Sequence, residues 1–73
     1  MIIIYDLKKF FTEKGLKQSH FAQKIGISRQ LMNYHVSKGD MPLSMLSVIA
    51  EEMSMPVDKL IKTLNDKYVK KKI

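Results

Sequence analysis

Residues 18–36, with the sequence QSHFAQKIGISRQLMNYHV, decide the fold. The spacing predicts a helix over about 17–25, because three apolar residues share one helical face: Phe21, Ala22 and Ile25. Gly26 ends this helix, since glycine readily adopts the left-handed conformation that a tight turn needs. Ser28 begins the next helix, because a serine side chain accepts hydrogen bonds from the free N–H groups of a helix N-terminus.

The second of these helices, predicted over 28–38, has an apolar and a polar face. Met32, together with His35 or Val36, lies on the face toward the core. Four polar residues remain on the outward face: Arg29, Gln30, Asn33 and Tyr34. Arginine pairs with guanine, and glutamine or asparagine with adenine, so this face can reach base edges. Two helices joined by a short glycine-containing turn at a steep angle form a helix-turn-helix arrangement.

Three further short helices are predicted on either side of this pair. Asp6 caps the first, which Gly15 ends, and Pro42 and Pro56 start the fourth and the fifth. Their expected core residues recur at helical spacing: Leu7, Phe10, Phe11; Leu43, Leu46, Ile49, Ala50, Met53; and Val57, Leu60, Ile61, Leu64. The fold class expected is therefore all-α, a compact five-helix domain over 1–66.

The two ends of the chain are less regular. The β-branched residues of Met1 to Ile4 predict either a short strand or a cover for the core. Residues 67–73 are expected to be a frayed or extended basic tail. Among the six methionines, three are expected to be less buried and are candidates for a subunit interface: Met41, Met45 and Met55.

The net charge of +6 is concentrated in two parts of the chain. Residues 14–39 hold five basic residues and no acidic one: Lys14, Lys17, Lys24, Arg29 and Lys38. The tail holds four lysines: Lys67, Lys70, Lys71 and Lys72. A basic face on a folded domain suits a polyanion, and the alternative is a set of ordinary solvated lysines. For the tail, a solvated end and added phosphate affinity both remain open.

Composition excludes several classes of protein. With 73 residues and no cysteine, the chain has room for one small core and cannot use disulfides or thiolate zinc sites. It has no apolar run near the roughly 20 residues of a transmembrane helix, and no secretory signal, so a cytoplasmic protein is expected. No catalytic motif is found, and His20 and His35 lack further ligands at metal-binding spacing. We therefore expect neither an enzyme nor a cofactor.

The pattern resembles the phage repressor family, the Cro and Xre type of helix-turn-helix domain. The resemblance covers about 7–61, and its matching points fall in the second to fifth helices: Gln18, Phe21, Ala22, Gly26, Ile27, Ser28, Met32, Pro42, Leu46, Ala50, Met53, Val57 and Leu60. It implies a lambda-repressor-like fold. The chain departs from the family at three points. Lys17 stands where a serine or threonine often caps the second helix, His35 and Val36 replace an aromatic residue and a glutamate, and Gly39 falls one residue late.

The resemblance implies roles for eight residues. Arg29, Gln30 and Tyr34 match base-reading positions, and the adjacent Asn33 contacts base or backbone. Gln18 matches a glutamine that binds a phosphate and steadies the reading helix. The other phosphate contacts implied are Lys17, Lys38 and Ser28, the last chiefly as a helix cap. Each has a plainer alternative as a solvated surface residue, and Tyr34 could instead cover the edge of the core.

These observations predict a sequence-specific regulator of transcription that binds duplex DNA, most simply a phage or bacterial repressor. The helix over 28–38 would lie in the major groove, and a homodimer would bind an inverted repeat. The expected dimer surfaces are the fifth helix and Met1 to Tyr5, which could pair as strands across the two-fold axis. The alternative is a protein-interaction module on the same fold, antitoxin-like or inhibitory, whose main partner is another protein.

Overall fold

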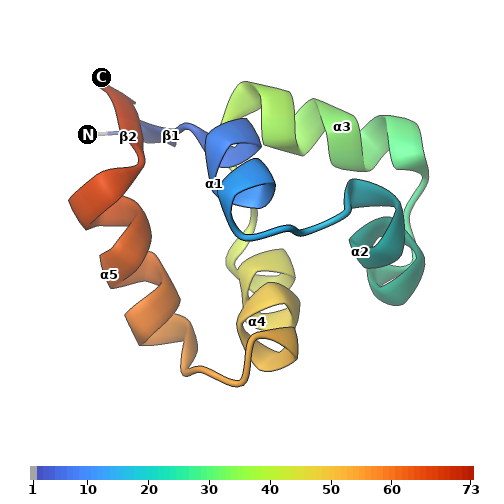
Figure 1. The fold of residues 1–73 in the computed structure, drawn as a ribbon. Coiled ribbons are helices and arrows are strands. Elements are labelled where there is room, and N and C mark those ends of the chain that lie inside the picture. The colour runs from blue at the N-terminus through green and yellow to red at the C-terminus, as the bar shows by residue number, and fades with distance from the viewer. Residues whose placement is uncertain (1) are drawn as a thin grey trace.

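The computed structural model describes residues 2–73, which form five helices and two strands (Figure 1). In chain order these are β1 (Ile3–Tyr5), α1 (Leu7–Glu13), α2 (Gln18–Ile25), α3 (Arg29–Lys38), α4 (Leu43–Glu52), α5 (Val57–Lys67) and β2 (Val69–Lys72). The five predicted helices are confirmed. The fold is mostly helical rather than all-α, because the two ends of the chain pair as a small sheet. The expected strand began at Met1, which lies outside the described residues.

The helix boundaries follow the local signals in the sequence. The side chain of Asp6 accepts a hydrogen bond from the N–H of Lys9 (3.2 Å), and that of Ser28 accepts one from the N–H of Leu31 (3.0 Å). Gly26 and Gly39 end α2 and α3 with φ of 90° and 76°, in the left-handed region. Lys17 precedes α2 and does not cap it, because a lysine ammonium cannot accept a hydrogen bond from the helix N–H groups.

The core lies where all five helices meet, and aromatic rings connect its parts. The ring of Phe11 lies edge-on to that of Phe21, with centroids 5.9 Å apart, and so joins α1 to α2. The ring of Phe10 lies edge-on to that of Tyr68 at 5.2 Å. Aromatic pairs in this arrangement stabilise by about 0.5–1.5 kcal/mol beyond the area they bury. The largest fully buried side chains are Phe10, Phe21, Leu7, Met32, Ile49, Leu60, Leu64 and Val36.

The predicted buried stripe of α4 is wrong at its first residue. Leu43 is 58% exposed, because it is the first residue of α4 and lies at the edge of the helix side that the buried residues Met45, Leu46, Ile49 and Ala50 define. Met45 is only 6% exposed and takes its place, and Met41 turns inward from the segment before α4. Met41 and Met45 are therefore core residues, and the prediction that they are less buried and form a subunit interface is wrong. Met55 is partly buried against the core.

The tail is extended rather than frayed. β2 pairs antiparallel with β1, with Ile3 opposite Lys72 and Ile4 opposite Lys71. Mutual backbone hydrogen bonds of 2.7 Å between Ile2 and Ile73 continue the ladder. β1 thus pairs with a strand of its own chain, where the sequence had suggested pairing across a two-fold axis.

The residue just before β2 belongs to the core. Tyr68 is buried, and its hydroxyl donates a hydrogen bond of 2.6 Å to the Glu13 carboxylate. This bond, followed by burial, raises the pKa of the Tyr68 hydroxyl above its ordinary value. The C-terminal segment is thereby held against α1.

The terminal sheet is fixed to the end of α3. The N–H of Tyr5 donates a hydrogen bond to the carbonyl of Gly39 (2.9 Å). Gly39 is buried there, and a β-carbon on it would overlap the carbonyl oxygen of Tyr5. A glycine at this position therefore both ends α3 and lets the backbone of β1 approach.

Candidate nucleic-acid interface

A three-residue connection, Gly26 to Ser28, joins α2 to α3. The N–H groups of Gly26 and Ile27 both donate to the carbonyl of Ala22, at 2.9 and 3.0 Å. These bonds close the turn through the left-handed Gly26. Ala22 is buried, which allows α2 and α3 to pack closely at this end.

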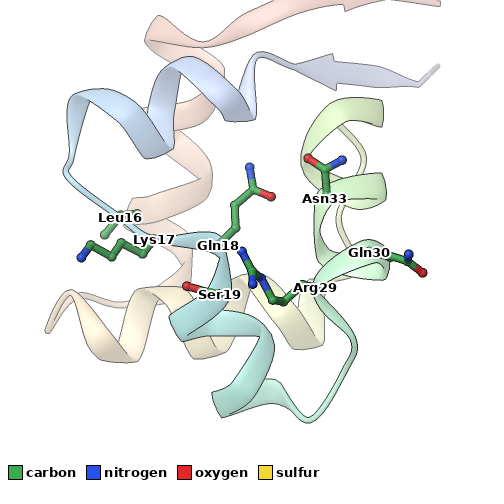
Figure 2. A pocket seen from close by; sticks show the side chains of 7 residues that line it. All are labelled: Leu16, Lys17, Gln18, Ser19, Arg29, Gln30 and Asn33. Atoms are coloured by element: carbon green, nitrogen blue, oxygen red, sulfur yellow. The ribbon is translucent and has the colours of Figure 1, made fainter.

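The N-terminal end of α2 and the first turns of α3 form the two sides of an open hollow of about 730 Å³. Figure 2 shows the Arg29 side chain extending toward the start of α2, where Gln18 lies, with Asn33 one turn further along α3. Gln30 lies at the rim and points away. The lining residues are Leu16, Lys17, Gln18, Ser19, Arg29, Gln30 and Asn33. Five of the eight predicted site residues are therefore brought together: Lys17, Gln18, Arg29, Gln30 and Asn33.

Two other predicted residues occupy a neighbouring strip of α3. Tyr34 is 53% exposed, and the Nζ of Lys38 lies 5.5 Å from the centroid of its ring. A cation at this distance over an aromatic face is attracted to the ring. The Tyr34 side chain is therefore presented to solvent with a positive charge beside it, and it does not cover the core.

Ser28 is confirmed as a helix cap. Its Oγ accepts the bond from the N–H of Leu31, and its own hydroxyl proton remains able to donate. The residue lies at the solvent-exposed beginning of α3. Its second role, a phosphate contact, stays a prediction.

Leu31 and Ser19 are exposed residues of this surface that were not among the predicted site residues. Leu31 is 43% exposed on α3, because one residue before the core residue Met32 it is rotated by about 100° away from the core. Helical periodicity alone therefore predicts that Leu31 is exposed. Ser19 lies in the first turn of α2 and lines the hollow beside Gln18.

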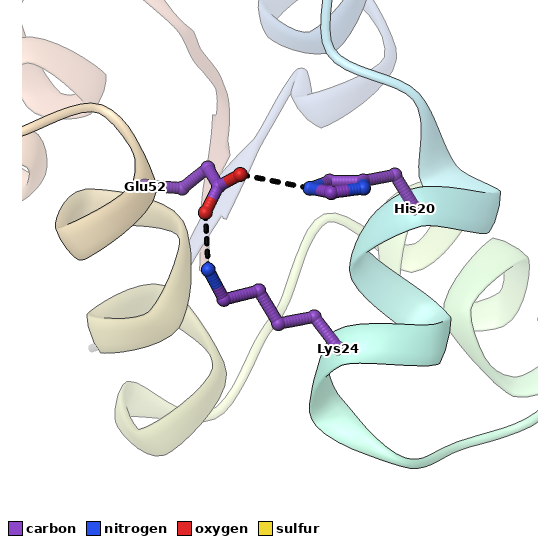
Figure 3. A network of polar contacts seen from close by, with 3 residues as sticks. All are labelled: His20, Lys24 and Glu52. Carbon is purple, nitrogen blue, oxygen red and sulfur yellow. Dashed lines mark hydrogen bonds and ion pairs between the residues drawn. The ribbon is translucent and has the colours of Figure 1, made fainter.

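The positive charges around the hollow and on α3 have no ion-pair partner in the part of the chain that the structure describes. Between residues 2 and 73, the acidic residue that forms ion pairs is Glu52, on α4, and it binds His20 and Lys24 of α2 (Figure 3). Within that range, Lys17, Arg29 and Lys38 therefore lie near no acidic side chain at salt-bridge distance. Their charge is available to an external anion.

The Glu52 pairs fasten α2 to α4 beside the hollow, in a depression that Lys17, His20 and Glu52 all line. The Oε1 of Glu52 lies 2.9 Å from the Nε2 of His20, and its Oε2 accepts from the ammonium of Lys24. The hydrogen bond from Lys24, followed by that from His20, lowers the pKa of the Glu52 carboxyl. The same bond to Glu52 raises the pKa of Lys24. Lys24 and His20 are thus engaged within the protein.

Metal-holding clusters and membrane-spanning helices are not found among the described residues. No group of three or more histidine, aspartate or glutamate residues within 2–73 is arranged to hold a metal ion. His35 is half-buried, with its ring edge-on to that of Tyr34 at 5.6 Å. None of the five helices in this range has the length and apolar character to cross a membrane.

Comparisons of the chain with protein-family models, with curated proteins and with solved structures find no match.

Proposed function

We propose that the protein binds duplex DNA at specific sequences and regulates transcription, most simply as a repressor that blocks polymerase. In this proposal α2, the connection and α3 act as a helix-turn-helix in a lambda-repressor-like domain. The main supporting observation is the exposed face of α3. Arg29, Gln30 and Asn33 lie there beside Gln18, and no acidic side chain within residues 2–73 forms an ion pair with them. The protein would act by binding alone, without catalysis and without a cofactor.

The dimensions and chemistry of α3 support its role as the reading helix. Its 10 residues give a length of about 15 Å, and the major groove, about 12 Å wide, admits such a helix. Arg29 suits guanine, while Gln30 and Asn33 suit adenine. The exposed Leu31 adds an apolar side chain suited to the thymine methyl group. Tyr34 lies on the same outer surface and contacts base or backbone.

The start of α2 supports a phosphate contact. Lys17 provides no side-chain cap, and the first turn of α2 holds no acidic residue. The first N–H groups of this helix therefore have no side-chain cap and carry a partial positive charge, which favours an anion. Gln18 and Lys17 would bind the phosphate there, and Ser28 and Lys38 would bind others beside α3. Such contacts fix the register in which α3 meets the bases.

A homodimer would supply the affinity that one small module lacks. A single module buries about 600–1,000 Å² against DNA, and two half-sites about 34 Å apart would double the contacts. Of the two expected dimer surfaces, α5 is the better supported. β1 already pairs with β2 and bonds to Gly39 through Tyr5, and Met1 lies outside the described residues.

Salt dependence distinguishes this function from a protein-interaction module. We expect log Kd for duplex DNA to rise linearly with log salt, with a slope near 0.9 for each phosphate neutralised, because counterions are released on binding. Fluorescence anisotropy with a labelled duplex between 50 and 200 mM salt, values typical of such titrations, measures this slope. A flat response, or no duplex binding at all, would move the function to a protein partner.

A further inference from the structure

β2 carries a second concentration of positive charge, away from the hollow. Lys70, Lys71 and Lys72 are all exposed, and none forms an ion pair with an acidic side chain among residues 2–73. The sequence leaves open whether they are a solvated end or phosphate ligands. The pairing of β2 with β1 separates the lysines by the face of the sheet on which each one lies.

The two faces of the sheet are identified through β1. The hydroxyl of Tyr5 donates a hydrogen bond of 2.6 Å to the Oδ1 of Asn65, so this face is turned toward α5. Ile3, two residues away, lies on the same face because side chains alternate along a strand. Ile4 lies on the opposite face, where its Cγ2 would be 2.8 Å from a β-carbon on Gly39 at the end of α3.

Directly opposed residues of an antiparallel pair lie on the same face of the sheet. Lys71 is opposite Ile4 and therefore lies on the face that adjoins the end of α3. Lys72 is opposite Ile3 and lies on the face toward α5. Lys70 falls within the irregularity between the two registers and has no opposed residue. Adjacent lysines of equal charge thus differ in the side of the molecule they occupy.

The sheet continues from the C-terminal end of α3. The hydrogen bond from Tyr5 to Gly39 fixes β1 there, and Figure 1 shows α3 and the two strands along the same edge of the molecule. Lys38 is the last residue of α3, at the same end. A polyanion that lies along α3 and passes this end would next meet the face on which Lys71 lies.

We infer that Lys71 contacts the phosphate backbone of duplex DNA beside the bases that α3 reads. This inference rests on the proposed function and extends the binding surface from α2 and α3 to the terminal sheet. A lysine ammonium on a flexible stem binds phosphate as a point charge without reading sequence. The contact therefore adds affinity and a longer footprint, but no specificity.

The matched variants Lys71→Ala and Lys72→Ala test the inference on a duplex that the wild-type protein selects. We expect K71A to lower the slope of log Kd against log salt by about 0.9 and to weaken selected and random duplexes alike. K72A should keep the wild-type slope, and Lys71→Arg should restore it. Circular dichroism should show all three variants folded, since both side chains are exposed.

The inference is overturned if K71A and K72A have the same effect on DNA binding. If both weaken binding, the lysines act only as diffuse charge. If neither changes binding, β2 is a solvated end. The inference is also overturned if the two variants lose binding to phosphatidylserine vesicles but not to DNA. The proposed function is tested separately. It requires that the wild-type protein prefer the selected duplex over random duplexes and that Arg29→Ala lose this preference. A duplex trimmed of its flanking phosphates should abolish the effect of K71A and leave that of R29A.

Discussion

The two ends of α2 present their positive charge in opposite ways. At the N-terminal end, Lys17 and the adjacent Arg29 of α3 have no ion-pair partner among residues 2–73. Toward the C-terminal end, Lys24 is bound to Glu52 of α4, which also binds His20 in the first turn of α2. A net charge counted over 14–39 treats these residues as equal. The fold divides them into residues available to a ligand and residues that hold α2 in place.

Lys17 and Lys24, at the two ends of α2, therefore have separate roles. The Glu52 pairs fasten α2 to α4, which is itself part of the core through Ile49 and Ala50. The N-terminal end of α2, where Gln18 and Ser19 line the hollow, is thereby held beside the beginning of α3. Variants at the two ends should therefore change different measured quantities.

The largest effect is expected for Arg29→Ala. Loss of a bidentate base contact should weaken binding to the selected duplex by about 1–3 kcal/mol and relax selection at one base pair. Anisotropy titrations with selected and random duplexes measure both effects. Equal losses on the two duplexes would mean that Arg29 contacts only the backbone.

The next largest effect is expected for Lys17→Ala, with Lys24→Ala on the same helix for comparison. Lys17→Ala should weaken all duplexes alike and lower the salt slope by about 0.9, because one phosphate contact is lost. Lys24→Ala, its matched control, should leave the slope unchanged, because Lys24 is engaged by Glu52. Equal slopes for the two variants would contradict the division between the ends of α2.

The smallest effect is expected for Glu52→Gln, which should lower the thermal midpoint slightly near neutral pH. The pKa of Glu52 is lowered in the folded protein, so its contribution is present above the ordinary value of 4.5 and is lost as pH falls through the lowered pKa. The pKa of Lys24 is raised, so its contribution is present below 10.5 and is lost as pH rises through the raised pKa.

Thermal melts of the wild-type protein and E52Q from pH 3 to pH 8, a range of about five units around the carboxyl pKa, check this sign. The two midpoints should differ above the ordinary Glu52 pKa and converge in acid. A difference that grows toward low pH would mean that the pairs with Glu52 do not stabilise the fold.

The sequence predicts most of the local structure, since caps, turns and helical spacing act within a few residues. Asp6, Gly26, Ser28 and Gly39 mark helix ends where the structure has them. The outward face of α3 follows from the same periodicity, including the overlooked Leu31.

What the sequence does not reveal depends on residues far apart in the chain. Glu52 neutralises Lys24 across 28 positions, and β1 pairs with β2 across nearly the whole chain. The burial of Met41 and Met45 is likewise a matter of how α4 meets the core. No pattern within a few residues encodes such contacts, because they form only when the helices pack.

Selection of random duplexes by the purified protein, with Arg29→Ala in parallel, tests most directly whether α3 reads DNA sequence. We expect an enriched inverted repeat with half-site centres about ten base pairs apart, and a degenerate position in each half-site with R29A. A single enriched half-site would retain base reading and exclude the dimer. No enriched sequence, with duplex binding only at low salt, would contradict the account.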